Sequence, residues 1–124
     1  MKAYTDIEQS KKLAEILPLE SADMCFVNDG TSIKIDANPY NVRKLMWKDY
    51  VNEVSPCWSL AALLDALPEI NGIPLTLEKV KAKDGYEGYY YHIEYKNIVL
   101  IPYSKNPIDA CYEMILKLHE LNLL

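Results

Sequence analysis

The 124-residue chain has few of the residues on which several common functions depend. Arg43 is its single arginine, it has two histidines, and its four glycines form no phosphate-binding loop. The three cysteines are widely spaced and odd in number, which disfavours a disulfide framework and a structural zinc site. We therefore expect no metal and no cofactor.

The sequence also lacks an apolar run long enough to span a bilayer. Its first residues have no apolar core of the kind that marks a signal peptide. We therefore expect a cytoplasmic protein with reduced thiols and no membrane contact. The formal net charge of -5 disfavours nucleic acid, because that binding depends on Lys and Arg neutralising phosphates.

What the sequence does have is the composition of a globular protein, with 50% hydrophobic and 25% charged residues. Its length predicts one domain, residues 1–124. Capping signals predict three helices. The first helix covers 5–17, with Thr5 and Glu8 as a capping box. The second covers 56–67, with Ser55 as N-cap, and is apolar enough to lie at the centre of the fold. The third covers 107–121 and follows the N-cap Asn106.

Alternating patterns predict the strands. Residues 24–27 and 32–36 flank an Asn-Asp-Gly turn and predict a hairpin. Residues 75–83, 89–96 and 98–103 predict a three-stranded antiparallel meander, with a bulge near Glu78. Residues 40–54 fit either a fourth helix or a strand. The predicted fold is therefore α+β, with three or four helices packed on an antiparallel sheet.

Two residues are weak catalytic candidates. Cys57 would lie at the N-terminus of the second helix, where the dipole lowers a thiol pKa, and His92 on the meander could act as its base. The competing interpretation is a buried cysteine and a solvated histidine, and it is the one we favour.

Tyrosine is the most conspicuous excess, with ten Tyr against a single Phe. Six lie within residues 86–103. Alternation along 89–96 predicts that Tyr89, Tyr91 and Tyr95 face inward. Tyr86, Tyr90 and Tyr103 would then be exposed and are the candidate binding residues, because interfaces favour tyrosine.

A basic patch is the alternative use of the same sheet. Lys79, Lys81 and Lys83 would share one face beside Tyr90, as in single-stranded nucleic-acid binders. Nearby glutamates dilute this charge, so nucleic acid is the less favoured partner.

Three segments resemble a known group of proteins: TDIEQSKKLAEILP (5–18), PCWSLAALL (56–64) and NPIDACYEMILKL (106–118). They are similar to small uncharacterised proteins of prophages and mobile elements in gut anaerobic bacteria. The resemblance implies a bacterial, cytoplasmic context and carries no catalytic residue with it.

The function predicted from these observations is non-enzymatic binding of a protein partner through the tyrosine-rich sheet and loop. A small hydrolase or transferase using Cys57 with a histidine is the alternative, and a single-stranded nucleic-acid binder is the second alternative. The sequence leaves the partner and the oligomeric state open.

Overall fold

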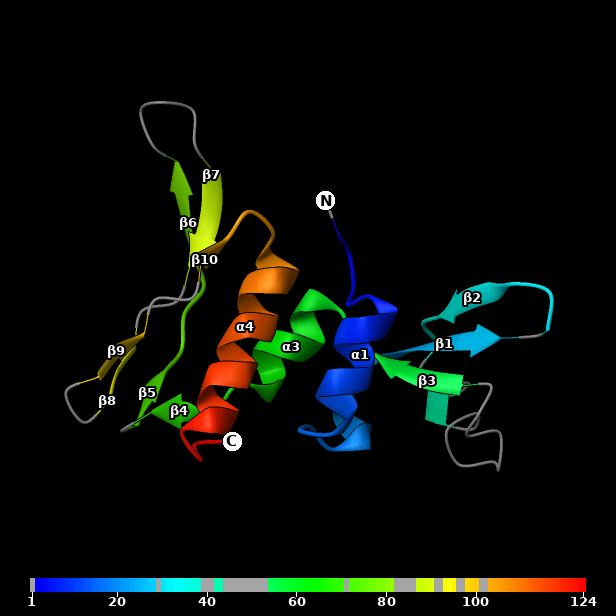
Figure 1. Ribbon diagram of the computed structural model, residues 1–124, viewed down its shortest axis with the longest axis horizontal. Helices are drawn as coiled ribbons and strands as arrows, with labels where there is room; N and C mark the ends of the chain where they lie inside the picture. Colours follow the sequence, from blue (N-terminus) through cyan, green and yellow to red (C-terminus); the bar gives the residue numbers. More distant parts are fainter. Residues whose placement is uncertain are drawn as a thin grey trace. The chain divides into compact units, whose positions relative to one another are not determined.

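The computed structural model describes residues 2–28, 30–38, 42–43, 54–70, 72–81, 87–90, 93–95, 98–100 and 103–124. Over these residues the protein is α+β, with three α-helices and antiparallel strand pairs (Figure 1). The chain divides into two compact units, Ala3–Ala62 and Leu63–Leu124 together with Met1–Lys2. We describe each unit by itself, and one domain over residues 1–124 stays a prediction.

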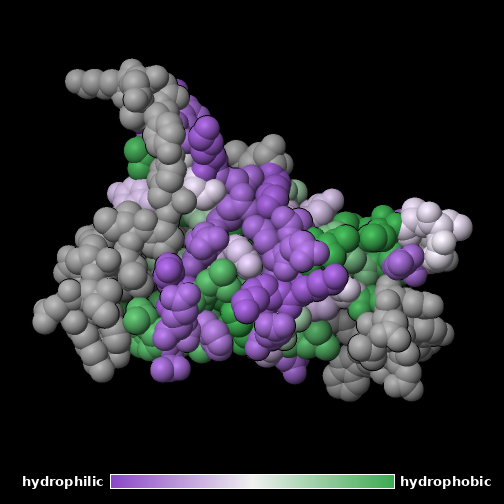
Figure 2. Space-filling model, viewed as in Figure 1, coloured by the Kyte–Doolittle hydropathy of each residue, from purple (hydrophilic) through white to green (hydrophobic). Residues whose placement is uncertain are grey.

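The Ala3–Ala62 unit contains a three-stranded sheet in the order β2-β1-β3. Strands β1 (Met24–Asn28) and β2 (Ile33–Asp36) form the predicted antiparallel hairpin. Gly30 in the connecting turn has φ +91°, a conformation that glycine adopts without strain. Figure 2 shows hydrophobic side chains at the surface of this hairpin, where Ile33 is 53% exposed.

Helix α1 (Ile7–Ala14) is shorter than predicted and is capped differently. Asp6, not Thr5, is the N-cap: its carboxylate accepts the Gln9 N–H at 2.8 Å, and the Gln9 side chain accepts the Asp6 N–H at 3.2 Å. Thr5 is fully buried instead. The 3₁₀ helix η1 (Leu19–Ser21) follows Pro18, as expected from a residue that ends a helix.

The predicted helix 56–67 is wrong at its start. Residues Val54–Cys57 form strand β3, which pairs antiparallel with β1, and helix α3 covers only Leu60–Ala66. The Ser55-Pro56 pair predicts a helix start, but Ser59 is the residue before the helix, and its Oγ accepts the Ala62 N–H at 3.2 Å. Leu63 is the only buried residue of α3, so this helix is less enclosed than its apolar sequence predicted.

Residues 40–54 fit either a helix or a strand by sequence. Residues 42–43 are helical and Val54 belongs to β3, while residues 40–41 and 44–53 lie outside the described part of the chain.

In the other unit, strands β4 (Glu69–Ile70) and β5 (Ile73–Pro74) pair around Gly72, which has φ +77°. A three-stranded sheet follows in the order β10-β7-β6, built from β6 (Glu78–Lys81), β7 (Glu87–Tyr90) and β10 (Tyr103–Ser104). Strands β8 (Ile93–Tyr95) and β9 (Ile98–Leu100) form a separate antiparallel pair. Residues 75–77 precede β6 outside any strand, so the slip in alternation there does not need the predicted bulge.

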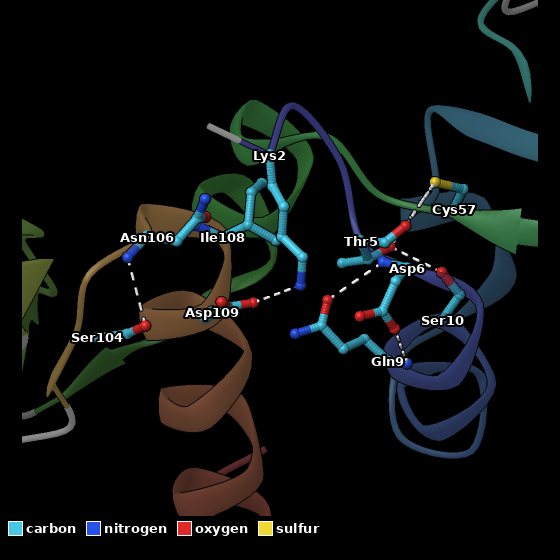
Figure 3. A network of polar contacts seen from close by, with 10 residues as sticks. All are labelled: Lys2, Thr5, Asp6, Gln9, Ser10, Cys57, Ser104, Asn106, Ile108 and Asp109. Carbon is cyan, nitrogen blue, oxygen red and sulfur yellow. Dashed lines mark hydrogen bonds and ion pairs between the residues drawn. The ribbon is translucent and has the colours of Figure 1, made fainter.

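Helix α4 (Pro107–Glu120) matches its prediction within one residue. The Asn106 side chain accepts the Ile108 N–H at 2.8 Å, and Lys2 pairs with Asp109 in the first turn at 2.7 Å (Figure 3). The helix contacts β7 and β10. Its buried side recurs at helical spacing, so burial of that side is what orders the helix. The buried residues are Pro107, Ile108, Ala110, Cys111, Met114, Ile115 and Leu118.

Candidate functional site

Cys57 is placed by strand β3 and is fully buried. Its thiol donates to the Thr5 carbonyl oxygen at 3.4 Å and accepts a weak hydrogen bond from Thr5 Oγ1 at 3.7 Å. Ser10 Oγ lies 2.8 Å from Thr5 Oγ1 (Figure 3). The residue is therefore not at a helix N-terminus, which was the reason for considering it a nucleophile.

Burial raises the pKa of the Cys57 thiol above its ordinary 9.0, and hydrogen bonds from Thr5 and Ser10 oppose that shift only in part. Burial also raises the pKa of the Cys25 thiol, to about 11, with Asp36 adding to the shift. All three cysteines are free and buried. Because the thiolate is the nucleophile, burial and a raised pKa both disfavour Cys57 as a nucleophile.

Two further sets of hydrogen bonds fix the residues that directly follow Cys57 in the sequence. The Trp58 N–H donates to Thr5 Oγ1 at 3.1 Å, and its indole N–H donates to Ser21 Oγ at 3.0 Å. Asp23 accepts both the backbone N–H of Ser59, at 2.9 Å, and its hydroxyl. These contacts join β3, η1 and the start of α3, so this cluster holds the unit together.

The candidate binding residues lie on the β10-β7-β6 sheet. Tyr90 on β7 stands opposite Glu78 on β6, and its hydroxyl donates to the Glu78 carboxylate at 2.5 Å at the surface. That hydrogen bond raises the pKa of the Tyr90 phenol above its ordinary 10.0. Tyr103 on β10 pairs with Tyr90 on the other side. Tyr90 thus sits in the middle of the sheet, with its hydroxyl held across two strands.

The register of β6 against β7 shows which side chains share a face of the sheet, and it differs from the predicted arrangement. Lys79 stands opposite Tyr89 and Lys81 opposite Glu87, with Lys81 Nζ 3.3 Å from the Glu87 carboxylate. Facing residues in a ladder lie on the same side of a sheet, so Tyr90 lies on the side away from these lysines. The predicted basic face with Tyr90 is therefore wrong. Tyr89 and Tyr90 are both half-buried, so burial does not separate the two, and the inward Tyr89 and outward Tyr90 stay a prediction.

The other predicted residues are placed less completely. Tyr103 is described by its backbone pairing alone. Tyr86, His92 and Lys83 lie outside the described residues. Within the described ranges, the acidic, histidine and cysteine side chains form no group that could hold a metal ion. No described helix is both long and apolar enough to cross a membrane.

Sequence reasoning missed Glu78, the partner of Tyr90. The alternation of apolar residues in 75–80 changes phase where β6 begins. The sequence therefore does not predict which residue of β6 lies opposite Tyr90. It also missed Thr5 and Ser10, because Thr5 was assigned to a cap. Two hydroxyl residues five apart around an N-terminal helix carry no distinct pattern.

Comparison with known proteins adds no relative. The sequence matches no protein-family model, and no curated protein and no solved structure is significantly similar to it. The mobile-element resemblance of residues 5–18, 56–64 and 106–118 therefore stays a prediction.

Proposed function

We propose that this protein is a non-enzymatic interaction protein that binds a protein partner through the β10-β7-β6 sheet. The observation that carries the proposal is the pair formed by Tyr90 and Glu78. A hydrogen bond of 2.5 Å across two strands holds the Tyr90 hydroxyl at the surface of the sheet. An aromatic ring that is already ordered loses little conformational freedom on binding, which is why tyrosine is favoured in interfaces.

Tyr86 and Tyr103 extend this proposed surface. Tyr103 pairs with Tyr90 on the neighbouring strand, and Tyr86 directly precedes β7 in sequence.

The described strand pairs also fit the predicted three-stranded meander. The register is the same for two residue pairs, Tyr90 with Tyr103 and Ile93 with Leu100. We therefore propose that β7 and β8 form one arm of a hairpin and that β9 and β10 form the other. With β6 this makes the predicted meander, and it would give the tyrosines a continuous sheet.

The cysteine-dependent hydrolase or transferase ranks second. Its nucleophile, Cys57, is buried with a raised pKa, and the histidine it requires, His92, lies outside the described residues. The single-stranded nucleic-acid binder ranks third, because Glu87 pairs with Lys81 on the lysine side of the sheet. A cytoplasmic, bacterial mobile-element context is part of the proposal through the resemblance.

The proposal is tested by locating the partner and then measuring affinity. A photo-crosslinking amino acid at position 90 identifies the bound protein, and an equivalent label at Tyr4, in the other unit, is the matched control. With the purified partner, Tyr90→Ala is expected to weaken binding by about tenfold or more, as buried interface tyrosines do. Tyr4→Ala, which removes a 36% exposed tyrosine, is expected to change it less than twofold. Equal effects of the two substitutions would contradict the proposed surface.

A further inference from the structure

We infer that the outer edge of β6 accepts an extended, acidic segment of the partner as an additional antiparallel strand. This inference rests on the proposed function, because it names the kind of partner that the sheet would bind. It concerns a different part of the sheet from Tyr90, namely the free side of the Glu78–Lys81 strand.

The position of β6 is the first observation. In the order β10-β7-β6 it is an end strand, and among the described strands it pairs with β7 alone. In a ladder, alternate residues turn their N–H and C=O groups away from the paired strand, so an end strand offers these groups to another chain. Three of the four β6 residues are exposed, and Val80 is half-buried. No described strand pairs with the free side of β6, so a partner strand can add there.

The charge pattern is the second observation. Lys79 and Lys81 share one face of β6, while Glu78 and Val80 share the other. Lys81 forms an ion pair with Glu87 at the surface, and because surface ion pairs are weak, Lys81 can pair with a carboxylate of the partner instead. Lys79 has no ion-pair partner among the described residues. A partner strand with two carboxylates at alternate positions would place them opposite these lysines, and an apolar residue between them would face Val80.

The same pattern disfavours a second copy of this chain. When a two-fold axis relates two copies of β6, the strands pair antiparallel and each face of one strand continues the same face of the other. Residues directly opposite each other then come from the same face. In one possible register Lys79 lies opposite Lys79 of the second copy, and in another it lies opposite Lys81 of the second copy. Like charges directly opposite each other destabilise a sheet, so the edge rejects itself and favours an acidic strand.

A nucleic-acid strand fits this edge less well than a peptide. Phosphates would meet the lysines, but they could not continue the backbone ladder that the strand edge offers. The test therefore includes an oligonucleotide as a competing ligand.

The test uses the full chain and a synthetic peptide, acetyl-Ser-Thr-Glu-Val-Glu-Lys-Ser-amide. In antiparallel order its Glu-Val-Glu-Lys segment opposes Lys81, Val80, Lys79 and Glu78. Binding is measured by fluorescence anisotropy of the labelled peptide. The controls are the charge-reversed peptide, two versions N-methylated at alternate residues, and a labelled oligothymidine of similar length.

The expected result has three parts. The acidic peptide binds, the charge-reversed peptide binds about tenfold more weakly or not at all, and only one of the two N-methylated versions loses binding. Lys79→Glu with Lys81→Glu weakens the acidic peptide by about tenfold or more. The control variant Lys11→Glu with Lys105→Glu makes the same change in net charge at residues outside β6 and leaves binding unchanged. Circular dichroism of both variants checks that they are folded.

Several results would overturn the inference. They are absence of peptide binding, equal effects of the two N-methylated versions, preference for the oligothymidine, or dimerisation of the protein itself. If the partner still requires Tyr90 while the peptide does not bind, the edge inference fails and the proposed function stands. If Tyr90→Ala leaves partner binding unchanged, the proposed surface fails by itself.

Discussion

The polar groups of the two units are used in opposite ways. In the Ala3–Ala62 unit, the hydroxyls of Thr5 and Ser10 and the thiol of Cys57 are buried, and they satisfy one another. In the sheet of the other unit, Tyr90 pairs with Glu78 at the surface. Buried polar groups are costly to leave unpaired, whereas surface pairs contribute little to folding. The first set therefore maintains the fold, and the second is free to serve a partner.

The comparison predicts its largest effect at Trp58. This fully buried side chain also donates its indole N–H to Ser21. Trp58→Ala is expected to lower the free energy of unfolding by about 3–5 kcal/mol, because it leaves a cavity in the core. Trp58→Phe keeps most of the volume and should cost less. Urea unfolding followed by circular dichroism measures both, and a small effect of the alanine variant would show that this region does not hold the unit.

Thr5 tests the buried polar cluster without changing the volume of the core. Thr5→Val removes the hydroxyl that accepts the Trp58 N–H and contacts Ser10. The Trp58 N–H, the Ser10 hydroxyl and the Cys57 thiol then each lose a partner, so the free energy of unfolding should fall by about 1–3 kcal/mol. Thr5→Ser keeps a hydroxyl and is the matched control in the same urea experiment. Equal stability of the valine variant and the wild type would contradict the role assigned to the cluster.

The stability of the protein should depend on pH through the buried thiol of Cys25. Its pKa is raised to about 11 in the folded protein from the ordinary 9.0. The unfolded chain therefore loses this proton first, and the stability that the buried thiol contributes is lost as the pH rises from about 9 to about 11. Other groups titrate in the same range. The measured quantity is therefore the difference in urea midpoint between wild type and Cys25→Ala at pH 8 and at pH 10.5.

That difference should change with pH in one direction, with the wild type losing its relative advantage at the higher pH. A difference that stays constant between the two values would mean that Cys25 has an ordinary pKa in the folded protein.

The smallest effect on stability is expected at the sheet surface. Glu78→Gln removes the carboxylate that raises the pKa of Tyr90, so this pKa should move down toward its ordinary 10.0. The urea midpoint should not change, because the pair lies in solvent. NMR titration of the Tyr90 ring in the wild type and in the variant measures the shift. A loss of stability equal to that of Thr5→Val would remove the distinction between the units.

Local signals predicted those parts of the fold that depend on neighbouring residues. The Asn106–Pro107 start of α4 and the turn between β1 and β2 were predicted, since each depends on a few adjacent side chains. The helix predicted at 56–67 failed because Pro56 suits both a first helical turn and a strand. Its pairing opposite Cys25 decided for the strand, and that contact is distant in sequence.

The candidate site was predicted in composition but not in arrangement. The excess of tyrosine pointed to the sheet, and Tyr90 is there. Its bond to Glu78 and its separation from Lys79 depend on the register of β6 against β7, which a shift of one residue would reverse. Burial of Cys57 likewise depends on Thr5, a contact 52 residues apart in sequence.

The most direct test of the account compares Tyr90→Ala and Thr5→Val in two assays, urea stability and affinity for the partner crosslinked at position 90. Tyr90→Ala should lower the urea midpoint less than Thr5→Val does and weaken partner binding by about tenfold or more. Thr5→Val should lower the midpoint and, at a temperature where it is folded, bind the partner as the wild type does. The opposite result, with Tyr90→Ala unfolding the protein more easily while binding stays intact, would contradict the claim that this sheet surface serves a partner.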